Sequence, residues 1–192
     1  MKVFWIEGLP GSGKTVLINS LCTALGEKIV FFPKMDVPAI FKNANFDYRP
    51  YFSPDYNADL AVEKLKIAVL NGAKSNRPII SERSYISTCV YYSILHQEKS
   101  IDTSQYNVII DSLMRFSKKY DEYFIYLECG AKESLARDTH VFSGFWHNTS
   151  RIQNAKLFYK MFLNQFSLEK TCIIPAETPD IVLKKVKEFI FS

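Results

Sequence analysis

A glycine-rich stretch, GLPGSGKT at residues 8–15, lies between an apolar run at 2–7 and a run with helical spacing at 16–25. Glycine and proline stabilise neither a strand nor a helix, so the stretch is predicted to be a turn between the two. Its three glycines let the backbone curl until successive N–H groups point at one anion. The helix that follows presents its positive N-terminus to the same anion. In this context the pattern G-x-x-x-x-G-K-[ST] predicts a phosphate-binding loop.

The residues of this loop have distinct expected roles. Lys14 is expected to reach the β- and γ-phosphates of a nucleotide, and the hydroxyl of Thr15 is expected to bind Mg²⁺. The alternative is a glycine-rich turn that binds nothing, and the strand before it and the helix after it argue against that interpretation. The predicted nucleotide-binding residues are Gly8, Leu9, Pro10, Gly11, Ser12, Gly13, Lys14 and Thr15.

The rest of the chain alternates between strand-like and helix-like segments. Further strands are predicted at 28–32, 78–81, 123–127 and 171–174, and further helices at 59–71, 85–95, 106–119, 132–138, 150–166 and 179–191. Such alternation is typical of a mainly parallel sheet with helices on both faces, the three-layer α/β fold of P-loop NTPases. The length of 192 residues suits one domain over 1–192.

Charge, hydropathy and cysteine content limit the ligands and the cellular compartment that we expect for this protein. A net charge of +4 without a long block of like charge does not indicate binding to a nucleic-acid polymer. No apolar run approaches the length of a membrane span, so no membrane partner is expected. The four cysteines are widely spaced and form no CxxC pair, which favours free thiols in a reducing compartment over a zinc site. We therefore expect a cytoplasmic protein with a small anionic ligand.

A second candidate site is PIISERSYIST at residues 78–88, where Glu82 and Arg83 follow a predicted strand. The carboxyl ends of strands in an open α/β sheet face the ligand crevice. A carboxylate there can hold Mg²⁺ or take a proton from an attacking hydroxyl. An arginine beside it can clamp a phosphate or orient a substrate. An exposed Glu–Arg pair without function is the alternative, and the phosphate loop in the same sheet favours the functional interpretation.

These two stretches together, IEGLPGSGKT and SERSYIST, resemble the thymidylate kinase and deoxynucleoside kinase group. IYLECGAKESLARD at 125–138 is similar to the group's fourth strand and the helix leading to its lid, and CIIPAETPDIVLKKVKEFI at 172–190 to its last strand, adenine-side loop and closing helix. The resemblance implies transfer of a phosphoryl group from ATP, with Mg²⁺, to a small-molecule acceptor that is a nucleoside or a nucleoside monophosphate. It also implies a homodimer, the common state in the group.

Carried over by position, the resemblance implies catalytic roles for Lys14, Glu82, Arg83 and Arg137. Glu82 corresponds to a metal-side or catalytic carboxylate, so Thr15 and Glu82 are the candidate metal ligands. Arg83 corresponds to a ligand of the substrate or of a phosphate. Arg137 matches the arginine at the start of the lid and could contact the transferring phosphoryl group, although an ordinary solvated helix arginine is an equal alternative.

The chain departs from the group's pattern at two places. Deoxynucleoside kinases usually place Glu-Pro after the second strand, and that glutamate is their general base, whereas here the strand ends FFPKMDVP. Asp36 is the nearest carboxylate and could substitute, although a loop aspartate is more often a turn former or a cap. The expected short lid, DTHVFSGFWHNTS at 138–150, has no arginine before Arg151, whereas the group's lid is commonly arginine-rich. Packing and surface roles are favoured for His140, Trp146 and His147.

The irregular stretch 33–57 is where acceptor-binding groups are expected. Phe41, Phe46, Tyr48, Arg49 and Tyr51 interleave rings with a cation. Stacking of a ring on a base contributes about 1–3 kcal/mol in nucleic-acid complexes, although most of these rings are better explained as core. The candidate substrate-binding residues are Asp36, Tyr48, Arg49 and Arg83.

Three classes of function thus fit the sequence. The first is a kinase of a nucleoside or nucleoside monophosphate. The second is a kinase of another small metabolite built on the same sheet. The third is a catalytically weak, nucleotide-binding regulatory module. A GTPase switch is less favoured, because the sequence has no N-K-x-D motif to read guanine.

Overall fold

The computed structural model describes residues 2–32, 76–115, 121–137, 145–146 and 148–192. Several sequence predictions lie outside the described residues. These are the irregular stretch 33–57, the helix at 59–71, most of the lid, and the side chains of Asp36, Phe41, Phe46, Tyr48, Arg49, Tyr51, His140 and His147.

The described strands form one five-stranded sheet with the order β2-β3-β1-β4-β5, and all of its neighbours pair in parallel. The central strand β1 pairs with β3 on one side and β4 on the other, and its sequence KVFWIEG is largely apolar because helices pack on both faces of the sheet. The strands are β1 (Lys2–Gly8), β2 (Val30–Phe32), β3 (Ile79–Glu82), β4 (Asp121–Glu128) and β5 (Thr171–Pro175).

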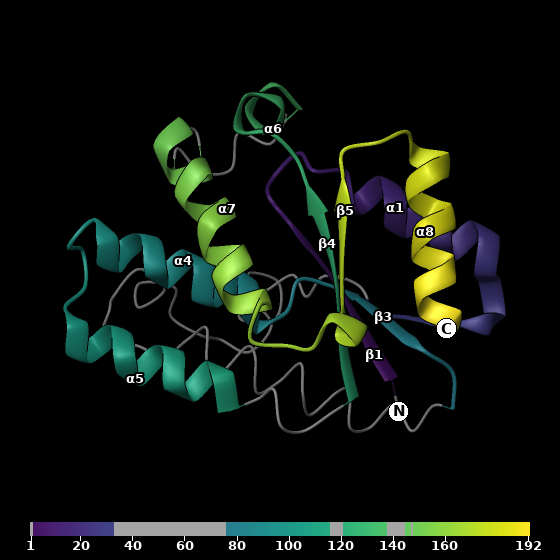
Figure 1. The fold of residues 1–192 in the computed structure, drawn as a ribbon, viewed down its shortest axis with the longest axis horizontal. Helices are drawn as coiled ribbons and strands as arrows, with labels where there is room; N and C mark the ends of the chain where they lie inside the picture. Colours follow the sequence, from purple (N-terminus) through teal and green to yellow (C-terminus); the bar gives the residue numbers. More distant parts are fainter. Residues whose placement is uncertain (1, 33–75, 116–120, 138–144, 147) are drawn as a thin grey trace, which may run out of the picture.

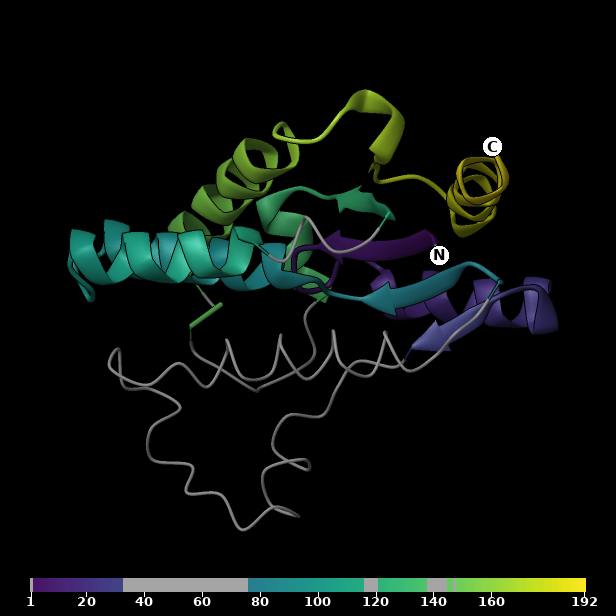
Figure 2. The same ribbon diagram turned by 90° about the horizontal axis from the view of Figure 1, so that it is seen from below.

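Helices cover both faces of this sheet, as Figures 1 and 2 show from two directions. On one face lie α1 (Lys14–Leu25) and α8 (Pro179–Phe191). On the other lie α4 (Tyr85–Gln97), α5 (Thr103–Met114) and α7 (Thr149–Leu163). The short helix α6 (Ala131–Arg137) follows the carboxyl end of β4, at the top of Figure 1. Short 3₁₀ turns occupy Gly26–Lys28 and Leu168–Lys170.

The alternation of side chains along β1 divides the core into two layers. Phe4 and Ile6 pack with Leu21 of α1 on one face of the sheet. Val3 and Trp5 pack with α4 and α7 on the other. This arrangement confirms the predicted three-layer α/β fold with a parallel sheet.

The strands and helices predicted within the described residues are all present, with shifted ends. Helix α5 begins at Thr103, three residues before the predicted start at 106. The reason is a capping box: the Asp102 carboxylate accepts from the Gln105 backbone N–H at 2.8 Å, and the Gln105 side chain accepts from the Asp102 N–H at 3.2 Å. Gly26 ends α1 with φ 48°, as its position in the sequence predicted.

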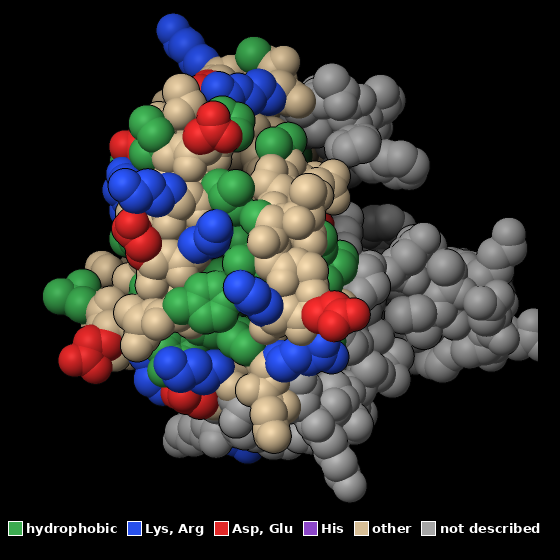
Figure 3. Space-filling model, turned by 90° about the vertical axis from the view of Figure 1, so that its right-hand side faces the viewer, with side chains coloured by type: hydrophobic (Ala, Val, Ile, Leu, Met, Phe, Trp, Pro, Cys, Tyr) green, Lys and Arg blue, Asp and Glu red, His purple; other side chains and the backbone are tan. Residues whose placement is uncertain are grey.

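The side of the molecule formed by α8 carries basic and acidic side chains close together rather than a block of one sign (Figure 3). Among the residues that the structure describes, no helix has both the length and the apolar character needed to span a membrane.

Candidate functional site

The carboxyl ends of β1, β3 and β4 meet at one edge of the sheet. The parallel register pairs Ile6 with Glu82 and Gly8 with Leu127. The phosphate loop therefore follows the central strand, with the Glu82–Arg83 pair beside it on one side and the start of α6 on the other. This is the crevice position expected for a ligand in an open α/β sheet.

The backbone of the loop requires glycine at its first position. Gly8 has φ 147°, and a Cβ there would lie 2.8 Å from the carbonyl oxygen of Leu127 and 2.6 Å from Ser12 Oγ. Gly13 has φ 93° and is the N-cap of α1, where no side chain caps the helix. The first amides of α1 are thus left for an external acceptor, as the phosphate-loop prediction requires.

Lys14 lies across the inside of this loop. Its side chain is buried, and Nζ donates to the carbonyl oxygens of Gly8 at 2.9 Å and Leu9 at 2.7 Å, with a longer contact of 3.4 Å to Ser12 Oγ. Burial is the main reason that the pKa of Lys14 is lowered to about 7, and the charge of Arg83 lowers it further. Glu82 and Glu7 act in the opposite direction but do not reverse the shift.

The structure brings Glu82 and Arg83 close enough to Lys14 for their charges to affect its pKa. Glu82 is the last residue of β3 and is half-buried. Arg83 follows it with φ 60°, a left-handed conformation that is rare for a residue with a side chain. The Arg83 N–H donates to the Ile6 carbonyl at 3.0 Å, and its Nη1 lies 3.5 Å from Ser87 Oγ.

Two polar anchors of this edge were missed by the sequence analysis. Glu7, inside the apolar strand β1, is fully buried and accepts from the Ser84 N–H and from the hydroxyls of Ser84 and Ser87. Ser134 of α6 donates to the Pro10 carbonyl at 2.6 Å and so fixes α6 against the loop. A carboxylate within a buried strand was the available signal for Glu7, because such a group is retained only where it is hydrogen-bonded.

The remaining predicted residues make contacts outside the phosphate loop. Arg137 ends α6 with its side chain 54% exposed, and it pairs with Glu133 at 2.5 Å. At the far end of the lid, Arg151 pairs with Glu98 and stacks over Phe145, with 4.3 Å from its guanidinium carbon to the ring centre. Trp146 packs against Phe145, which agrees with the packing role expected for it.

The donor atoms at the predicted metal position suit Mg²⁺. Thr15 is exposed at the start of α1, and Glu82 is half-buried at the end of β3, so both supply hard oxygen ligands at the same edge. Within the described ranges, no group of three or more His, Cys, Asp or Glu side chains could hold a metal by itself. A Mg²⁺ ion at Thr15 and Glu82 would therefore need phosphate oxygens and water to complete its coordination.

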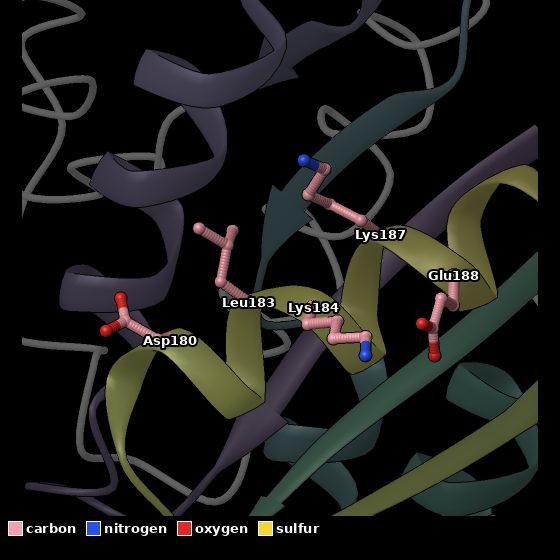
Figure 4. A pocket seen from close by; sticks show the side chains of 5 residues that line it. All are labelled: Asp180, Leu183, Lys184, Lys187 and Glu188. Carbon is pink, nitrogen blue, oxygen red and sulfur yellow. The ribbon is translucent and has the colours of Figure 1, made fainter.

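A surface groove of about 460 Å³ is present elsewhere in the molecule. Its described lining side chains all come from α8 (Figure 4): Asp180, Leu183, Lys184, Lys187 and Glu188. These side chains belong to a different element from the phosphate loop and the Glu82–Arg83 pair. None of them is a predicted site residue.

No family model matches the chain, and no curated protein sequence matches it. Solved structures do match. The structure of deoxyadenosine kinase from M. mycoides with bound dATP superposes with a TM-score of 0.73 and 17% identity, over 100% of both chains. The same enzyme with products dCMP and a flexible dCDP gives a TM-score of 0.70 and 17% identity, over 98% of this chain and 97% of that one. The chain thus shares its fold with these deoxyadenosine kinase structures.

Replacing Gly8 by alanine tests the loop geometry. We expect the Gly8→Ala protein to lose measurable binding of ATP in calorimetry, because the new Cβ would collide with the Leu127 carbonyl in a conformation that strains any side chain by about 1–3 kcal/mol. Gly26→Ala is the matched control: it also has a positive φ, but nothing lies within 4 Å of its Cβ position. Equal ATP affinity in the two variants would contradict the assignment of residues 8–15 as a phosphate-binding loop.

The lowered pKa of Lys14 predicts a pH-dependent affinity for ATP. A bound triphosphate favours the charged ammonium and raises the pKa of Lys14, so binding takes up a proton above pH 7. Affinity is then greatest below the free-state pKa and weakens by up to about tenfold per pH unit as the pH rises above it. Calorimetry in buffers of different ionisation enthalpy measures the proton uptake directly.

The Lys14→Arg protein is the control, because a guanidinium stays charged over this whole pH range. Its affinity should retain only the pH dependence that comes from ATP and from the other groups of the site. An identical pH dependence and proton uptake in the two proteins would show that Lys14 does not titrate on binding.

Proposed function

We propose that this protein is a kinase that transfers the γ-phosphoryl group of ATP to a hydroxyl of a deoxynucleoside. The observation that carries the proposal is the convergence of a complete phosphate loop and the Glu82–Arg83 pair on adjacent strands of one sheet edge. The likeness in fold to deoxyadenosine kinase structures, one of them with bound dATP, supports the choice of acceptor class.

The residues of the site divide the work of phosphoryl transfer among them. Lys14 and the free amides at the start of α1 would hold the β- and γ-phosphates of ATP. Mg²⁺ held by Thr15 and Glu82 would neutralise charge on the phosphate oxygens. Arg83 would bind the acceptor or the transferring group, as its proximity to Lys14 suggests.

In the reaction, the acceptor hydroxyl oxygen bonds to the γ-phosphorus while the bond from that phosphorus to the bridging oxygen of ADP breaks. The hydroxyl proton passes to a carboxylate, either Glu82 or a group such as Asp36 that lies outside the described residues. Arg137 would reach the transferring group only by leaving its pair with Glu133. We further propose that the chain works as a single domain over 1–192 and as a homodimer.

The direct test supplies MgATP with each deoxynucleoside and each deoxynucleoside monophosphate and measures ADP release. We expect turnover with at least one deoxynucleoside and none with the Lys14→Ala protein, which loses the cation inside the loop. Lys184→Ala removes the same charge from an exposed position on α8 and should keep full activity.

Turnover with monophosphates alone would favour a thymidylate kinase-like acceptor instead. Tight binding of ATP without turnover on any acceptor would replace the kinase with the nucleotide-binding module considered above.

Replacing Glu82 distinguishes its two candidate roles. The Glu82→Gln protein is expected to lose about 100-fold or more in kcat, which is within the range for removal of a general base or a metal ligand. If the carboxylate holds Mg²⁺, excess Mg²⁺ or Mn²⁺ should restore part of the rate. If it accepts the proton, metal has no effect and the acidic limb of the pH–rate profile disappears. An unchanged kcat would remove Glu82 from the site.

A further inference from the structure

Glu7 is a buried carboxylate to which neither the sequence nor the proposed chemistry assigns a role. It has no exposed surface, although it lies next to the phosphate loop. One oxygen accepts from the Ser84 N–H and the Ser84 hydroxyl, both at 2.6 Å, and the other accepts from the Ser87 hydroxyl at 2.5 Å. Such charge-assisted hydrogen bonds are about twice as strong as those between neutral groups. The carboxylate thus ties β1 to the start of α4, 77 and 80 residues later in the chain.

Arg83 immediately precedes Ser84, which is bonded to Glu7, and it has a strained backbone conformation. A left-handed φ of 60° is unfavourable for a residue with a side chain, and it persists only where the surroundings enforce it. Two contacts enforce it here. On one side the Arg83 N–H is bonded to the Ile6 carbonyl of β1. On the other, Ser84 is held by Glu7 and caps α4 by accepting from the Ile86 N–H at 3.0 Å.

Ser87 links Glu7 to the side chain of Arg83. Its hydroxyl donates to Glu7, lies 2.8 Å from the Tyr159 hydroxyl of α7, and stands 3.5 Å from Arg83 Nη1. Glu7 therefore holds both the backbone that follows Arg83 and a hydroxyl that contacts the Arg83 guanidinium.

We propose that Glu7 is a positioning residue, which holds Arg83 in its strained conformation through Ser84 and Ser87 and so aims the guanidinium at the phosphate loop. This inference rests on the proposed function, because it takes Arg83 to act on the transferring group or the acceptor. Glu7 itself touches neither, since it is enclosed by protein.

A second buried glutamate provides a matched comparison. Glu122 is 3% exposed and accepts from Trp5 Nε1 at 3.0 Å and from the Tyr85 hydroxyl at 2.9 Å. Glu122 of β4 pairs in register with Val3 of β1, whereas Glu7 of β1 pairs with Tyr126 of β4. Val3 and Glu7 are four residues apart along β1, which corresponds to about 13 Å of strand. Tyr85 begins α4, but it bonds to Glu122 through the hydroxyl at the far end of its side chain, so loss of Glu122 should reduce stability without moving the backbone of Arg83.

The experiment compares Glu7→Ala, Glu7→Gln and Glu122→Ala in the full chain. We expect Glu7→Ala to lower kcat by about 100-fold, the cost of misplacing a reacting group by about 1 Å. Glu7→Gln keeps an oxygen for Ser84 and should recover most of kcat. Glu122→Ala should lower the midpoint of urea unfolding but leave kcat unchanged.

A double-mutant cycle with Arg83→Ala tests whether Glu7 acts through the arginine. If it does, Glu7→Ala causes no further loss of kcat when Arg83 is already replaced. An undiminished loss in that background, or an equal loss in Glu122→Ala, would overturn the inference.

Crystal structures of the variants keep the inference testable apart from activity. In Glu7→Ala we expect Arg83 to relax to a negative φ and to lose its bond to the Ile6 carbonyl, and in Glu122→Ala we expect both to remain. If the wild-type protein transfers no phosphate to any acceptor, the proposed function fails, and the crystal structures alone decide whether Glu7 positions Arg83. A retained φ near 60° in Glu7→Ala would reject the inference even in an active enzyme.

Discussion

The parallel pairing of β1 with both β3 and β4 is the constraint on which the rest of the structure depends. It places three strand ends at one edge, with Glu82 opposite Ile6 and Leu127 opposite Gly8. A different group follows each strand end: the phosphate loop after β1, the Glu82–Arg83 pair at the end of β3, and α6 after β4. Because β1 is central and buried, its position is fixed by packing on both faces, and the loop that follows inherits that rigidity.

The charges at this edge are arranged so that none is isolated. Burial of Lys14 is the main reason that its pKa falls to about 7, and the nearby charge of Arg83 lowers the pKa further. Glu82 and Glu7 offset part of that lowering. A triphosphate would complete the balance by bringing negative charge to the two cations, so the site without nucleotide is the electrostatically less stable state.

Local patterns in the sequence made the main features of the fold predictable, and they also predicted which segments end at the candidate site. The phosphate loop, its strand and its helix are contiguous in sequence, and the Glu82–Arg83 pair follows directly from the end of a short apolar run. The boundary of α5 was missed, although its signal, an aspartate three residues before a glutamine at 102–105, is also local. The role of Glu7 was not predictable in this way, because its partners, Ser84 and Ser87, lie 77 and 80 residues away and meet it only in the folded sheet.

The difference between local patterns and long-range contacts also explains how this chain can share a fold with a protein of 17% sequence identity. Apolar periodicity and a few glycines determine the sheet and the loop, and many sequences satisfy these requirements. Gly8 is different, since any side chain there meets the Leu127 carbonyl, and Glu7 is different, since its carboxylate bonds to three donors at once. Both stand at the end of β1, so two neighbouring positions with strict local requirements lie where the strand ends and the loop begins.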